Sequence, residues 1–213
     1  MGRRILAIAA FALLFLHPVP ALAGPPAVCL LPFTDARPVK SPTSVPYNIK
    51  SENTPEPIRA HPADGLKAVR RAVLRALKSE PSIEVVDLAG ADPKRLASDP
   101  RVGRCSVLVG GAVFNYEGTV AVDVFGAKTY SGLVGFELVA ADPRRGRPLV
   151  PPVAFAGRRQ SDPVKADEDF GSSDRQTFNE WVGEALKVAS ASLGPRFVRP
   201  TVAAVRSRAR RPQ

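Results

Sequence analysis

The segment at residues 27–33, "AVCLLPF", decides the fold class because both of its alternating faces are apolar. One side carries Ala27, Cys29, Leu31 and Phe33, and the other carries Val28 and Leu30. A strand that is apolar on both sides is typical of a sheet covered on both faces, as in α/β proteins. We therefore expect a buried strand here, in a sheet against which helices pack.

The segment that follows in the same pattern is an amphipathic helix and then a second strand. Asp64 can cap a helix that Pro81 stops. Its apolar positions, at helical spacing, are Leu66, Val69, Val73 and Leu77, and basic residues fill the remainder at Lys67, Arg70, Arg71, Arg75 and Lys78. Residues 82–88, "SIEVVDL", predict the second strand, so a right-handed strand–helix–strand crossover is expected.

Residues 34–61 contain many prolines and polar side chains without an apolar period, and this composition predicts a long surface loop. The loop holds His61, which is the one histidine that remains once residues 1–23 are set aside. A histidine-based triad would rest on His61 alone, and a multi-histidine metal site is excluded. We interpret His61 as an ordinary loop residue.

From Cys105 onward the pattern changes to consecutive strands, at residues 105–116, 119–125, 132–142 and 149–159. The turns between them are expected at Glu117–Gly118, at residues 126–131 and at residues 142–148. Pro151 and Pro152 cannot donate ladder hydrogen bonds, so the last strand should lie at an edge or begin with a bulge. Gly110 and Gly111 lack the Lys-Ser/Thr of a phosphate loop, and we interpret them as sites of close packing.

A second helix should begin with a capping box of Ser173 and Gln176 and end at Gly194–Pro195. Its apolar face comprises Phe178, Val182, Ala185, Leu186, Ala189 and Leu193. Trp181 lies one position off this stripe, and we place it at the flank of the core and not in a binding site. The acidic residues 167–169 lack the ligand spacing of a calcium loop and are interpreted as a solvated turn.

These elements together predict an α/β fold in which two main helices pack on a mixed sheet. The order is strand–helix–strand, then an antiparallel meander, then a C-terminal helix. We expect a single domain over residues 24–195. Residues 196–213 are expected to form a basic tail, disordered from about Arg206 onward.

Residues 1–23 have the pattern of a cleaved secretory signal peptide. Arg3 and Arg4 precede an apolar run at residues 5–16, and Ala21-Leu22-Ala23 supplies the small residues of a cleavage site before Gly24. His17 and Pro18 break the apolar run well before the roughly 20 residues that a membrane-spanning helix needs. The mature chain should therefore begin at Gly24 and lie in the periplasm.

Cys29 raises the alternative of a lipid anchor. The residues before it, Pro26-Ala27-Val28, lack the Leu-small-small pattern that precedes a lipidated cysteine. We favour an unlipidated cysteine in a buried strand. Cys29 and Cys105 begin strands expected to be parallel neighbours, and the periplasm is oxidising, so we predict a disulfide between them, with two unpaired buried cysteines as the alternative.

The whole chain carries a net charge of +10, and removal of Arg3 and Arg4 leaves 28 basic and 20 acidic residues, a net charge of +8. Such a balance suits anionic partners such as lipid headgroups, lipopolysaccharide or nucleic acid. Two candidate surfaces are the basic face of the first helix and a terminal arginine cluster. That cluster comprises Arg206, Arg208, Arg210 and Arg211. A solvated tail without a partner is the alternative.

Three short motifs resemble small bacterial envelope proteins of the YajG-like type and the periplasmic domain of the curli-secretion lipoprotein CsgG. The matching positions are Pro32, Phe33, Asp35 and Arg37 at the end of the first strand, Val107, Leu108, Gly110 and Val113 in a later strand, and Asp142 and Gly146 in a turn. The resemblance covers most of residues 27–193. It implies a non-enzymatic role in envelope assembly or transport, with no catalytic residues to carry over.

We therefore expect a non-enzymatic periplasmic protein that binds another envelope component. The sequence indicates no catalytic, cofactor or metal residues and no small-molecule substrate, and it leaves a homo-oligomer open. One rival interpretation is a binder of anionic lipid, lipopolysaccharide or nucleic acid through the first helix and the tail. The other is a hydrolase that uses His61 and acidic residues.

Overall fold

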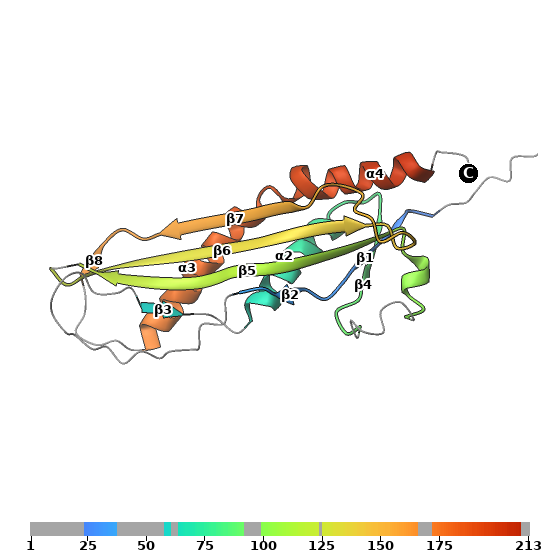
Figure 1. Cartoon of the computed structure of the whole chain (residues 1–213). Helices are drawn as coiled ribbons and strands as arrows, with labels where there is room; N and C mark the ends of the chain where they lie inside the picture. Colours follow the sequence, from blue (N-terminus) through green and yellow to red (C-terminus); the bar gives the residue numbers. More distant parts are fainter. Residues whose placement is uncertain are drawn as a thin grey trace, which may run out of the picture.

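A mixed sheet built around two long neighbouring strands forms the body of the protein, as the computed structural model in Figure 1 shows. The strands are β1 (Ala27–Leu30), β2 (Thr34–Asp35), β3 (Ile58–Ala60), β4 (Glu84–Asp87), β5 (Val107–Val122), β6 (Ala127–Ala141), β7 (Val153–Gln160) and β8 (Val164–Lys165). Their order is β4-β1-β5-β6-β7, with β2 and β3 along β5 and β8 beside β6. β1 runs parallel to β4 and β5, whereas β5, β6 and β7 are antiparallel.

The structure describes residues 24–37, 58–60, 64–91, 99–123, 125–165 and 172–209. The predicted signal peptide, His61 and the acidic residues 167–169 lie outside these ranges. The helical elements are α2 (Gly65–Lys78), η3 (Val102–Arg104), α3 (Ser172–Ser190), η4 (Gly194–Val198) and α4 (Arg199–Ala209). The predicted fold class, helices packed on a mixed α/β sheet, is confirmed.

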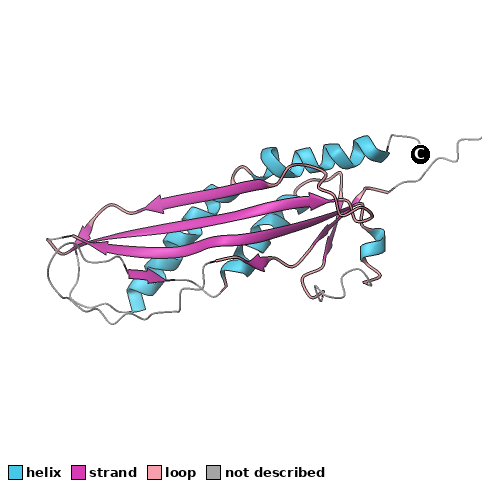
Figure 2. Ribbon diagram, in the orientation of Figure 1, coloured by secondary structure: helices cyan, strands magenta, loops and turns pink. Residues whose placement is uncertain are grey.

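Figure 2 shows α2 and α3 lying along one face of the sheet, with α4 near the start of β7. The core lies between these helices and the sheet. It joins Val28 and Leu30 of β1 to Val69, Val73 and Leu77 of α2, to Val134, Phe136 and Leu138 of β6, and to Val182, Ala185 and Ala189 of α3. All four residues of β1 are buried, as the apolar pattern on both of its faces predicts.

The strand–helix–strand unit is confirmed, and its helix differs from expectation in two details. Asp64 occupies the N-cap position of α2 but makes no capping side-chain hydrogen bond. Arg70 belongs to the basic side of the helix, which is expected to face solvent, yet it is partly buried. Its guanidinium donates hydrogen bonds to the carbonyl oxygens of Leu30, at 3.0 Å, and Leu31, at 3.1 Å. The same guanidinium pairs with Asp87 at the end of β4.

The predicted turn at Glu117–Gly118 is wrong, because β5 continues through these residues without interruption. Gly118 serves packing and not a turn, since a Cβ atom there would lie 2.8 Å from the Phe178 ring of α3. The actual turn follows Val122, earlier than the predicted residues 126–131. Gly126 adopts φ +80° in it, a conformation that favours glycine.

Helix α3 approaches the sheet most closely above two glycines. A Cβ atom at Gly132 would lie 2.2 Å from the carbonyl oxygen of Trp181, and one at Gly157 would lie 2.0 Å from that of Ala185. The predicted apolar face of α3 is confirmed, and Trp181 flanks the core as expected. The helix begins at Ser172, so the predicted cap Ser173 already lies inside it.

The predicted tail is wrong up to Ala209. The chain passes Gly194 and Pro195 in a π-helical turn, η4, and continues into α4. Phe197, Val198, Val202 and Val205 are buried in the main core. These four apolar side chains recur at helical spacing and pack against the core, although the arginine-rich composition of the segment predicts a solvated tail.

The predicted loop at residues 34–61 contains short strands at both ends, so that expectation is corrected there. β2 pairs with β5 through Thr34 and Asp35, and β3 pairs with β5 further along. Asp35 accepts hydrogen bonds from the Arg37 side chain and its backbone N–H. The hydrogen bond from the Arg37 side chain is the main cause of the lowered pKa of the Asp35 carboxyl, and the hydrogen bond from the Arg37 backbone N–H lowers this pKa further. β7, the strand that follows Pro151 and Pro152, ends the main strand order at the sheet edge, as these prolines predict.

Candidate functional site

The tip of the β5–β6 hairpin presents the most exposed aromatic side chain of the described residues. Phe125 is 92% exposed, and Val164 of the adjoining strand β8 is 53% exposed. Val164 belongs to this tip because it pairs with Lys128 near the start of β6. Figure 1 shows the tip at the far end of the molecule from the end of α4.

The tip is held in shape by one carboxylate. Asp123 accepts hydrogen bonds from the backbone N–H groups of Phe125, at 2.9 Å, and Ala127, at 2.8 Å. The backbone N–H of Asp123 in turn donates to the carbonyl oxygen of Ala127. These bonds fix the backbone on either side of Phe125.

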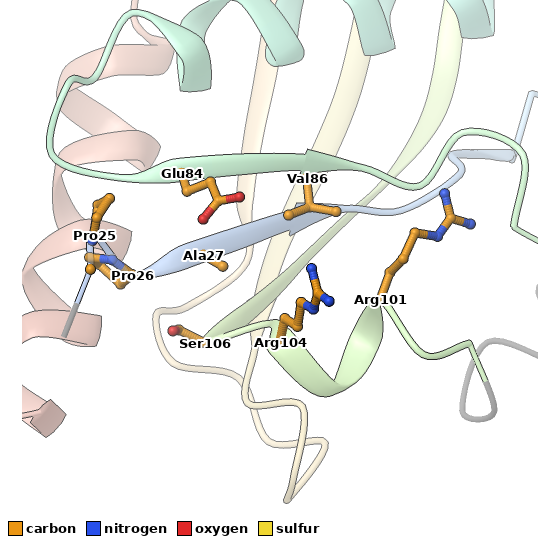
Figure 3. A pocket seen from close by; sticks show the side chains of 9 residues that line it. Pro25, Pro26, Ala27, Glu84, Val86, Arg101, Arg104 and Ser106 are labelled. Atoms are coloured by element: carbon orange, nitrogen blue, oxygen red, sulfur yellow. The ribbon is translucent and has the colours of Figure 1, made fainter. Parts of the chain in front are cut away.

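A pocket of about 450 Å³ with both polar and apolar lining lies at the opposite end, beside the first residues after the predicted cleavage site. Its lining comprises Gly24, Pro25, Pro26, Ala27, Glu84, Val86, Arg101, Arg104 and Ser106. Figure 3 shows the Glu84 carboxylate and the Arg104 guanidinium directed into the same space. Arg101 is paired with Asp99 at 2.7 Å, and this hydrogen bond is the main cause of the lowered pKa of Asp99.

The β6–β7 turn, which lies at the same end of the molecule as the pocket, is rich in arginine (Figure 1). Arg144, Arg145 and Arg147 are exposed, and Gly146 adopts φ +61° between them. The turn is anchored by Asp142, which is 6% exposed and pairs with Arg208 of α4 at 2.8 Å. The backbone N–H of Arg144 and then the Arg208 guanidinium hold the pKa of Asp142 below its usual value.

The structure separates the residues of the predicted terminal arginine cluster. Arg208 faces Asp142, whereas the charge of Arg206 acts on Glu80. The pKa of Glu80 is lowered first by its hydrogen bond with Ser82 and further by Arg206 and Arg199. Arg210 and Arg211 lie outside the described residues.

The predicted disulfide is present between Cys29 and Cys105, whose Cα atoms are 5.7 Å apart. It lies on the sheet face opposite α2, in a small apolar cluster with Leu88 and Ala91. Within the described ranges, no group of three or more His, Cys, Asp or Glu side chains is placed to hold a metal ion. Over the same residues, no helix combines the length and apolar character required to cross a membrane.

No protein-family model matches this sequence, and no curated protein matches it. Similar solved structures include PelC from Paraburkholderia phytofirmans, a dodecamer, at 14% identity over 81% of this chain and 86% of PelC, with a TM-score of 0.41. A DUF330 protein from Xanthomonas campestris shares 14% identity over 91% of this chain and 94% of its own, with a TM-score of 0.45. A lipoprotein from Neisseria meningitidis shares 12% identity over 75% and 96%, with a TM-score of 0.40. These likenesses are too distant to transfer an activity, a partner or an assembly to this chain.

The sequence predicts a strand over residues 119–125 and a turn over residues 126–131, so it places the turn a few residues too late and does not single out Phe125. Phe125 ends an alternating apolar run, and this pattern predicts the last position of a strand for it. The available signal was the spacing of Asp123 and Gly126, an acidic residue followed three positions later by glycine, which is typical of a tight turn.

Proposed function

We propose that this protein is a non-enzymatic, exported accessory protein that binds another component of the bacterial envelope through the β5–β6 hairpin tip. The observation that carries the proposal is the exposure of Phe125 at an ordered turn. Aromatic side chains, phenylalanine among them, are enriched at protein interfaces relative to the rest of the protein surface. The partner surface is expected to offer an apolar pocket that accepts the ring.

The energetics of such a contact are favourable. Burial of a phenylalanine side chain contributes roughly 1.5–3 kcal/mol, and aromatic anchors in ordered elements are common centres of binding energy. Val164 adds a second apolar contact beside it. The neighbouring backbone is already fixed by Asp123, so most of this gain is retained on binding.

The disulfide supports export to an oxidising compartment, since such bonds are rare in the bacterial cytoplasm. It also bears on the lipid-anchor alternative. The Cys29 sulfur is bonded to Cys105 and fully buried, so it is not available to carry a thioether-linked lipid in this state. The protein is therefore proposed to act as an unlipidated periplasmic form.

The proposal is tested with Phe125→Ser and a matched control, Val188→Ser, which removes a 36% exposed apolar side chain from α3. The tagged full-length chains are expressed in the native host and purified from envelope extracts. We expect Phe125→Ser to reduce a specifically co-purifying envelope protein at least tenfold, because an anchor residue contributes about 2 kcal/mol or more. Equal recovery of the same proteins with both variants would overturn the proposal.

A further inference from the structure

We propose that the arginine end of the molecule docks on a membrane surface of anionic phospholipid headgroups. The arginine end is defined as Arg104 of η3, Arg144, Arg145 and Arg147 of the β6–β7 turn, and Arg208 of α4. This surface lies opposite the hairpin tip and is independent of the function proposed for it. Four of its five residues were not among the sequence-based candidates.

The charges of this end are brought together by three separate elements. The ion pair between Arg208 and buried Asp142 attaches the end of α4 to the β6–β7 turn. The turn follows β6 directly where Leu108 pairs with Ala141, so it lies near the start of β5 and the adjoining η3. Figure 1 shows the turn, α4 and η3 grouped at the same end.

The balance of charge at this end is strongly positive and exposed. Asp142 is buried and already neutralised by Arg208, whereas Arg144, Arg145 and Arg147 all reach solvent. Each cation near an anionic membrane surface contributes about 1 kcal/mol, and the contributions combine over a cluster. Three solvent-facing guanidinium groups on one turn are therefore sufficient for measurable attachment.

The pocket gives this end a place for one headgroup. Arg104 directs its guanidinium into the pocket, where it can bind a phosphate with paired hydrogen bonds. Glu84 on the opposite wall can accept hydrogen bonds from headgroup hydroxyls, which suits phosphatidylglycerol. The volume of about 450 Å³ is sufficient for such a group.

A lipid surface fits this end better than nucleic acid does. Proteins that bind single strands combine a basic groove with aromatic side chains on which bases stack. Residues 99–106, 142–148 and 199–209, which form the end and its surroundings, contain no aromatic residue. The arginines are also gathered at one extremity of an elongated molecule, which suits contact with a flat surface.

The experiment measures binding of the purified mature chain, residues 24–213, to vesicles of phosphatidylglycerol and phosphatidylcholine at low and moderate salt. The test variant is Arg144→Gln/Arg145→Gln/Arg147→Gln. The control is Lys67→Gln/Arg71→Gln/Arg75→Gln, which removes the same charge from the exposed face of α2. We expect the test variant to lose about 100-fold in affinity for anionic vesicles, from about 1 kcal/mol per cation, and the control to lose less than threefold.

A second variant, Arg104→Gln, provides an independent test if the triple variant folds poorly. It should weaken binding to phosphatidylglycerol vesicles several-fold, whereas Arg158→Gln on β7 should not. The proposal is overturned if the α2 control loses as much affinity as the turn variant. It is equally overturned if wild-type protein shows no preference for anionic vesicles, or if a DNA oligonucleotide binds more tightly than the vesicles through the same arginines.

Discussion

Arg70 shows how one side chain holds three parts of the fold together. Its guanidinium bonds to the carbonyl oxygens at the end of β1 and to the Asp87 carboxylate at the end of β4. The hydrogen bond from the Arg70 guanidinium to the Asp87 carboxylate is the main cause of the lowered pKa of Asp87. The helical pattern predicted a basic outer face and could not distinguish Arg70 from Arg71. Only the position of the strand ends, a tertiary property, makes them different.

We predict that Arg70→Gln lowers the free energy of unfolding by about 1.5–3 kcal/mol, because it removes charge-assisted hydrogen bonds to partly buried acceptors. The exposed neighbour provides the control, since Arg71→Gln should change the free energy by less than about 0.5 kcal/mol. Urea denaturation followed by circular dichroism measures both. Equal values for the two variants would show that Arg70 contributes nothing beyond its charge.

Asp142 makes stability depend on pH. Its folded pKa lies below the unfolded value of about 3.9. Stability from the charged form is therefore present above about pH 4 and is lost as the pH falls through the folded pKa. We predict that Asp142→Asn lowers the melting temperature at pH 7 and that the difference from wild type narrows toward pH 3. Asp162→Asn, at an exposed position, serves as the control. A difference in melting temperature between Asp142→Asn and wild type that stays constant with pH would contradict the role of the charged Asp142 carboxylate in stability.

At the scale of elements, the sequence predicted the helices better than the hairpin. The apolar periodicity of α2 and α3 is regular, and their buried faces are those expected. Glycine was the source of error in the strands, because the same residue serves turns and close packing. Gly118 lies beneath Phe178 of α3. Because α3 follows some 50 residues later, the residues around Gly118 cannot indicate that a helix packs there.

Alanine substitutions at two glycines, Gly157 and Gly183, should change the stability of the protein in opposite directions. A Cβ atom at Gly157 would clash with the backbone of α3 at Ala185, so Gly157→Ala should lower stability by about 1–3 kcal/mol. Gly183 lies inside α3 with no atom near its missing Cβ, so Gly183→Ala should raise stability by about 0.5–1 kcal/mol. Thermal denaturation of both variants provides the measurement. A neutral Gly157→Ala would mean that α3 lies further from the sheet.

At the scale of the whole molecule, the C-terminal segment belongs to the fold. The arginine-rich composition suggested a solvated tail, although Phe197, Val198, Val202 and Val205 recur at the spacing of a buried helix face. Arg196 also lies over the Phe155 ring, 5.1 Å from its centroid. In this segment the spacing of the apolar residues, and not the arginine-rich composition, indicates the structure.

We predict that a chain ending at Leu193 loses the cooperative thermal transition of the full-length protein. Phe197→Ala alone should cost about 3–5 kcal/mol, since the ring is fully buried. Thr201→Val is the matched control on α4, because the Thr201 hydroxyl is buried without a hydrogen-bond partner and its removal should be neutral or stabilising. If the shortened chain melts like the full protein, the contacts of α4 with the core are dispensable.

The central claim is that the hairpin tip binds an envelope partner, and site-specific photocrosslinking in intact cells tests it most directly. A benzophenone analogue of phenylalanine replaces Phe125 in one strain and Val188 in another. We predict a light-dependent adduct of one envelope protein from position 125, with none from position 188. An adduct of equal yield from position 188, or no adduct from position 125 in protein that is exported and folded, would contradict the account.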